Sequence, residues 1–152
     1  MNRLLLKSAL MGMICGLFYL VPAATQESPT TRKAPIVRIT QGPEIERADT
    51  YLTIIRWTTN NPGGSDVHYG IVHYGTDRQD LSQTAKNPIR LNQGHQYTTF
   101  RVRMQGLKPA TTYYYKVTSE ESNAKSDGVT STVKEFTTPA AGERVVFSPG
   151  RD

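Results

Sequence analysis

The sequence has a single cysteine, and its one long apolar segment lies near the N-terminus. Cys15 falls inside that apolar run, residues 9–21, which is shorter than the roughly 20 apolar residues needed to span a bilayer core. Basic residues precede the run and small residues follow it, as in a secretory signal peptide. We expect residues 1–24 to be cleaved, with retention as an uncleaved membrane anchor as the alternative. Cleavage would remove Cys15, so the mature chain would form no disulfide and would depend on packing for its stability.

Helical periodicity and clustered charge are also lacking. No stretch keeps apolar residues three and four apart over three turns, which argues against folds that alternate strands with crossover helices. The formal net charge is +5, but the basic residues are scattered among acidic ones, which argues against a nucleic-acid surface. We therefore expect a secreted or periplasmic protein that binds no nucleic acid and has no stable membrane span after signal cleavage.

The sequence does contain a series of short runs rich in Val, Ile, Thr, Tyr and Phe. Gly, Pro, Asn and Asp separate these runs at a spacing typical of an antiparallel sandwich or barrel. The predicted strands are residues 35–41, 50–58, 67–75, 80–85, 96–105, 111–119 and 128–138. We expect an all-β, seven-stranded antiparallel immunoglobulin-like sandwich over residues 35–138, after a linker at residues 25–34. Residues 139–152 form a tail whose short apolar piece is either an extra strand or disordered.

The segment LKPATTYYYKV, residues 107–117, is predicted to form a corner between two strands. Pro109 would fix the turn and Leu107 would close the open end of the core. Tyr113 would begin the next strand with its ring inward, followed by Tyr115 on the same face. Because a buried tyrosine hydroxyl needs a partner, we expect Tyr113 to bond to the backbone of the loop before it, as in a tyrosine corner.

Trp57 on the second predicted strand, together with the pattern of Leu107, Pro109, Thr111 and Tyr113, resembles a fibronectin type III domain. The resemblance implies a central tryptophan in a core that needs no disulfide, with Trp57, Leu107, Pro109 and Tyr113 as structural core residues. The full predicted core is Ile55, Trp57, Val72, Tyr74, Phe100, Val102, Met104, Leu107, Tyr113, Tyr115, Val117 and Phe136.

A more specific resemblance is carried by IIRWTT, VHYGTDRQDLSQTA, LKPATTYYYKV and EFTTP. These segments are similar to the fibronectin-like domain that precedes the catalytic domain of purple acid phosphatases. In those enzymes a metallophosphoesterase domain with a dinuclear metal site follows directly. After EFTTP this sequence contains no Asp-x-His and no Asn or His. The resemblance therefore implies the N-terminal module without the catalytic machinery.

The three histidines are the first candidates for metal ligands. His68 and His73 are five residues apart and would point to opposite faces of one strand, while His95 would lie in a loop or at a strand start. We expect isolated surface histidines, no metal site and no cofactor. No nucleophile motif or phosphate-binding glycine loop is present, and Glu120 and Glu121 are expected to be solvated. We therefore do not expect an enzyme.

One sheet face is a candidate binding surface. Alternation places five residues outward on neighbouring strands: Tyr69, Ile71, His73, Tyr114 and Lys116. Exposed aromatic and aliphatic side chains can anchor a protein or a sugar ring, although cross-strand pairing alone is the alternative explanation. We expect a secreted non-catalytic module that binds or spaces a protein or carbohydrate in the cell envelope. A truncated or detached N-terminal module of a purple acid phosphatase-like enzyme, or a support for a separately encoded enzyme, are the alternatives.

Overall fold

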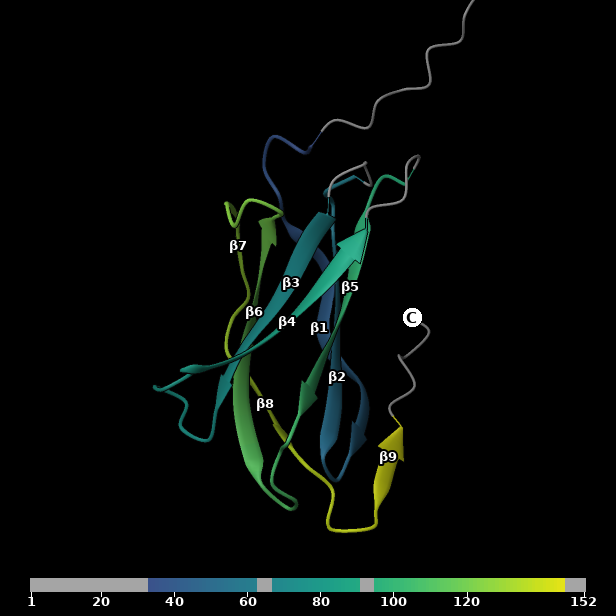
Figure 1. Ribbon diagram of the computed structural model, residues 1–152, viewed down its shortest axis with the longest axis vertical. Coiled ribbons are helices and arrows are strands. Elements are labelled where there is room, and N and C mark those ends of the chain that lie inside the picture. The colour runs from purple at the N-terminus through teal and green to yellow at the C-terminus, as the bar shows by residue number, and fades with distance from the viewer. Residues whose placement is uncertain (1–32, 63–66, 91–94, 147–152) are drawn as a thin grey trace, which may run out of the picture.

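Two antiparallel β-sheets packed face to face form the fold (Figure 1). The computed structural model describes residues 33–62, 67–90 and 95–146, so the expected signal peptide lies outside the described part. The strands in these ranges are β1 Ile39–Asp49, β2 Leu52–Thr59, β3 Val67–Gly75, β4 Gln83–Arg90, β5 Thr98–Gln105, β6 Thr112–Glu121, β7 Ser126–Thr130, β8 Lys134–Thr137 and β9 Arg144–Val146. Within the same ranges, no helix is long and apolar enough to cross a bilayer.

The strand order is that of a fibronectin type III sandwich. One sheet has the order β5-β2-β1-β9, and the other has the order β4-β3-β6-β7, with β8 also paired to β6. The first, second and fifth strands thus share one sheet, while the third, fourth and sixth share the other, as in immunoglobulin-like domains. The predicted all-β antiparallel sandwich is confirmed.

The first strand differs from its prediction at residues 35–41. The strand was predicted to end at Gln41, but β1 runs from Ile39 to Asp49 through register shifts against β2. Gly42 has a φ of 77°, and a Cβ there would lie 2.7 Å from the carbonyl oxygen of Arg56. A glycine at this position therefore allows a β-bulge instead of a strand end.

The fourth strand was predicted at residues 80–85 and instead runs from Gln83 to Arg90. Pro88, opposite Tyr69, falls inside it. Proline is tolerated here because β4 is the edge of its sheet and its other side needs no ladder hydrogen bonds.

The last predicted strand, residues 128–138, is split into β7 and β8, which pair with successive parts of β6. Ser131 lies at the break, where its backbone N–H donates to Val117 O at 3.0 Å. Its Oγ accepts from Val117 N–H, also at 3.0 Å. Ser131 therefore keeps the Val117 backbone paired where the ladder is interrupted.

The core agrees with the prediction. Trp57 stacks on Phe100 with ring centroids 5.0 Å apart. Pro109 is a correction, because it is exposed in the turn before β6 and serves the corner and not the core. The predicted core residues form one buried cluster: Ile55, Trp57, Val72, Tyr74, Phe100, Val102, Met104, Leu107, Tyr113, Tyr115, Val117 and Phe136.

The corner between β5 and β6 has the predicted hydrogen bond. The backbone N–H of Lys108 donates to the Tyr113 hydroxyl at 3.0 Å. Leu107 and Tyr113 are both buried. The tyrosine corner is confirmed, and it closes one end of the sandwich.

Candidate functional site

The predicted binding residues lie together on the outer face of the β4-β3-β6 sheet. His73 is opposite Lys116, and Ile71 is opposite Thr118 on β6. All of the predicted residues are half-buried, because each packs against its cross-strand neighbours. We call this surface the β3–β6 face: Tyr69, Ile71, His73, Tyr114 and Lys116.

Cations cover both aromatic rings of the β3–β6 face. Lys86 Nζ lies 4.2 Å from the ring centroid of Tyr69, and it also pairs with Glu120. Arg78 Cζ lies 5.9 Å from the ring centroid of Tyr114. Ring faces occupied by cations are poorly placed to stack on a sugar. The β3–β6 face therefore offers polar and ionic groups beside the apolar side chain of Ile71.

His73 is the histidine of this face, and it lies opposite Lys116 on β6. Its Nε2 lies 2.9 Å from Thr118 Oγ1. Burial and the nearby charge of Lys116 lower the pKa of His73 below its ordinary value of 6.5. The lowered pKa favours the uncharged imidazole of His73 at neutral pH.

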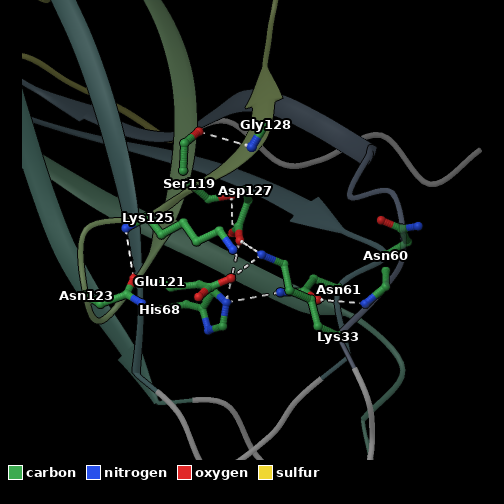
Figure 2. Close-up of polar contacts among 12 residues, drawn as sticks. Lys33, Asn60, Asn61, His68, Ser119, Glu121, Asn123, Lys125, Asp127 and Gly128 are labelled. Carbon is green, nitrogen blue, oxygen red and sulfur yellow. Dashed lines mark hydrogen bonds and ion pairs between the residues drawn. The ribbon is translucent and has the colours of Figure 1, made fainter.

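A second polar cluster, not anticipated from the sequence, lies at the end of the sandwich where the described chain begins (Figure 2). His68 is buried, and its Nε2 lies 3.2 Å from Asn61 Nδ2. Ser119 Oγ donates to Asp127 Oδ2 at 2.9 Å, and Lys33 Nζ lies 2.9 Å from Asp127 Oδ1. The expectation of surface histidines is wrong for His68, because its side chain points inward beside this carboxylate.

The cluster lacks the order needed for nucleophilic catalysis. In a Ser-His-Asp triad the imidazole lies between the hydroxyl and the carboxylate. Here Ser119 donates directly to Asp127, whose Oδ1 lies 3.8 Å from His68 Nε2. Ser119 is also only 1% exposed. Among the residues that the structure describes, no group of three or more His, Cys, Asp or Glu could hold a metal ion.

The polar cluster instead attaches the first described segment, residues 33–38, to the sandwich. The backbone N–H of Ala34 donates to Asn61 Oδ1 at 3.2 Å, and that of Arg38 donates to Asn60 Oδ1 at 2.7 Å. Asn60 Nδ2 donates in turn to Ile36 O at 3.0 Å. The two asparagines thus hold residues 34–38 through three hydrogen bonds to the backbone.

Ion pairs complete this attachment. Burial alone would lower the pKa of Lys33, but its contacts with Glu121 and Asp127 raise it overall. The hydrogen bond from Lys33 is the main reason that the pKa of Glu121 is lowered. The prediction that Glu120 and Glu121 are simply solvated is wrong, because both lie in β6 and each pairs with a lysine.

The fold resembles solved structures at low sequence identity. The sensor domain of the anti-sigma factor RsgI4 from Pseudobacteroides cellulosolvens, in its solution structure, is 19% identical, with 76% of this chain and 87% of that chain covered and a TM-score of 0.48. The third fibronectin III domain of human KIAA0343 is 15% identical, with 80% and 95% covered and a TM-score of 0.37.

Sequence comparison places the chain in a family. No curated protein matches it significantly. The family model for the purple acid phosphatase N-terminal domain matches residues 47–138, which run from β1 to just past β8. This chain therefore belongs to the purple acid phosphatase N-terminal domain family.

Proposed function

We propose that this chain is a secreted or periplasmic, non-catalytic module that binds a partner protein through the β3–β6 face. The observation that carries the proposal is the composition of that face. Ile71 supplies an apolar patch opposite Thr118 on β6 and Lys86 on β4. Tyr69 and Tyr114 supply rings already paired with cations. Large apolar anchors surrounded by polar groups are typical of protein interfaces.

The regular pairing of the strands also favours a protein partner. The face is built from regularly paired strands, so its side chains are held in a fixed relation to one another. Such a surface loses little conformational freedom on binding, because its residues are already half-buried against their neighbours. The same rigidity suits a spacer that positions a partner in the cell envelope.

The test is co-purification of the mature protein from its native envelope or culture fluid, followed by binding measurements with the recovered partner. The double variant Ile71→Ser/Tyr114→Ser should weaken binding at least about tenfold, because it removes an apolar anchor and an aromatic ring. The matched control is Ile54→Ser/Tyr51→Ser, which changes the same residue types on the other sheet and in the β1–β2 turn. Unchanged binding by the first variant would remove the β3–β6 face from the proposal.

A second candidate function follows from the family match. The matched model describes the N-terminal domain of purple acid phosphatases, so this module would serve a phosphatase domain, either within a longer chain or separately encoded. Recovery of a metallophosphoesterase in the co-purification would favour this role. Failure of the Ile71→Ser/Tyr114→Ser variant to release that enzyme would place the contact on another surface.

A further inference from the structure

A groove crosses the outer face of the other sheet, opposite the β3–β6 face. Its volume is about 670 Å³. Strands β1, β2 and β5 each contribute to it, and one lining residue lies just before β5. We call it the Tyr97 groove, lined by Thr40, Gln41, Arg56, Thr58, Tyr97 and Thr99.

Tyr97 provides an aromatic surface at one end of this groove. The residue is 54% exposed, and its ring contacts that of His95 at a centroid distance of 6.0 Å and an interplanar angle of 67°. Tyr69 and Tyr114 carry cations over their rings, whereas no described cation lies over Tyr97. Tyr97 therefore keeps an apolar, electron-rich surface on which the C–H face of a sugar can stack.

Hydroxyl and amide groups form the floor of the groove. Thr58 Oγ1 and Thr99 Oγ1 are 2.9 Å apart and hydrogen-bond to each other, and Thr40 Oγ1 donates to Thr58 O at 3.3 Å. Each hydroxyl still has accepting capacity after these bonds. Gln41 is exposed, and its side-chain amide makes no hydrogen bond to another described residue. The floor thus presents both donors and acceptors to a ligand rich in hydroxyl groups.

The positive charge of Arg56 in the groove is already compensated by a carboxylate. Arg56 Nε donates to Glu44 Oε1 at 3.0 Å, and Arg56 Nη2 pairs with the same oxygen. The remaining guanidinium N–H groups can donate to a neutral hydroxyl, while the carboxylate offsets the attraction for an anion. The other lining residues of the groove carry no charge. This distribution favours an uncharged ligand.

From these observations we propose that the Tyr97 groove binds a neutral oligosaccharide or polysaccharide. Tyr97 stacks on a sugar ring. Thr58, Thr99 and Gln41 exchange hydrogen bonds with its hydroxyl groups, and Arg56 donates to one of them. The site is independent of the β3–β6 face, so the module would hold a partner protein on one sheet and a glycan on the other.

The test is affinity electrophoresis of the secreted full chain in native gels that contain soluble mixed-linkage β-glucan, xylan or galactomannan. An acidic polysaccharide, polygalacturonate, forms a separate arm. At least one neutral polysaccharide should retard the chain. Tyr97→Ala should lower the association constant about tenfold, as expected for the loss of an aromatic stacking contact. Thr58→Val/Thr99→Val should also weaken retention, since it removes the hydroxyl groups while preserving shape.

Tyr51→Ala is the matched control, because Tyr51 is 63% exposed but lies outside the groove. Near-ultraviolet circular dichroism and thermal melting check that every variant is folded. The proposal is overturned if no neutral polysaccharide retards the chain, or if Tyr97→Ala leaves retention unchanged. It is equally overturned if Tyr51→Ala weakens retention as much, or if only polygalacturonate is bound. The last result would move the ligand to the neighbouring hollow at Arg101 and Arg103.

Discussion

At the scale of single residues, Gly70 makes room for the central tryptophan. A Cβ at Gly70 would lie 2.8 Å from both Trp57 Cη2 and Phe100 Cδ1. Those rings are stacked and almost completely buried. Because the core is close-packed, the two sheets can pack this closely only if residue 70 has no side chain.

We expect Gly70→Ala to lower the free energy of unfolding by about 1–3 kcal/mol, because the two rings must move to accept the methyl group. Urea titration gives the value. Trp57→Phe relieves one of the two close contacts of the methyl group, so the double variant should be less destabilised than the sum of the single variants. Strict additivity in this double-mutant cycle would show that Gly70 and Trp57 do not share a packing constraint.

The histidine of the β3–β6 face gives a prediction about pH. The pKa of His73 is lowered by burial and by the charge of Lys116, so the unfolded chain binds a proton more readily than the folded chain just below the ordinary pKa of 6.5. Stability should therefore fall as the pH is lowered through this range. The pKa of Glu121 is also lowered. Protonation of Glu121 would therefore reduce stability only at more acidic pH, around and below its ordinary pKa of 4.5.

The measurement is urea titration from about pH 7 to about pH 5 with the parent chain and His73→Gln. The variant should lose less stability over this interval, because glutamine does not take up a proton. Equal pH dependence of the two proteins would assign the effect to another group.

At the scale of strands, alternation predicted the core but not where strands end. Inward residues of β2, β5 and β6 were predicted because period two places them on one face. The extensions of β1 and β4 were missed for a common reason. Gly42-Pro43 and Pro88 are breakers by local propensity, yet a bulge accommodates the first and an unpaired sheet edge accommodates the second. Both depend on neighbouring strands that local sequence does not specify.

The short strand β9 covers part of the edge of β1, where Ala48 pairs with Val145. Thr50 holds the turn that leads into β9. Its Oγ1 donates to Ala140 O at 3.0 Å and accepts from Gly142 N–H at 3.2 Å. Of the two alternatives for the tail, an extra strand is therefore the one found for residues 144–146. Covering an edge in this way limits pairing between molecules.

We expect a chain that ends after Gly142 to associate and to melt at a lower temperature, since it exposes unpaired backbone groups of β1. Size-exclusion chromatography with light scattering measures the association, and calorimetry measures the melting temperature. Thr50→Val in the intact chain should lower the melting temperature without association. A truncated chain that stays monomeric and keeps its melting temperature would show that β9 does not protect the edge.

At the scale of the whole molecule, contacts between distant segments explain what sequence reasoning missed. Lys33 and Glu121 are 88 residues apart in sequence, and only the folded sandwich brings them together. Likewise, Tyr97 meets Thr58 and Gln41 in one groove because β5, β2 and β1 are neighbours. The predicted β3–β6 face was easier to find, since three of its residues belong to one alternating strand. Its binding role remains a proposal.

The central proposal is that this chain binds a partner and does not catalyse a reaction. The family match covers an N-terminal domain, and the buried cluster around Asp127 is ordered as a structural attachment. The most direct measurement is hydrolysis of a chromogenic phosphate ester by the purified chain in the presence of iron, zinc and manganese. The account predicts no turnover above that of the metals alone. Phosphatase activity that co-elutes with the folded chain in size-exclusion chromatography would contradict it.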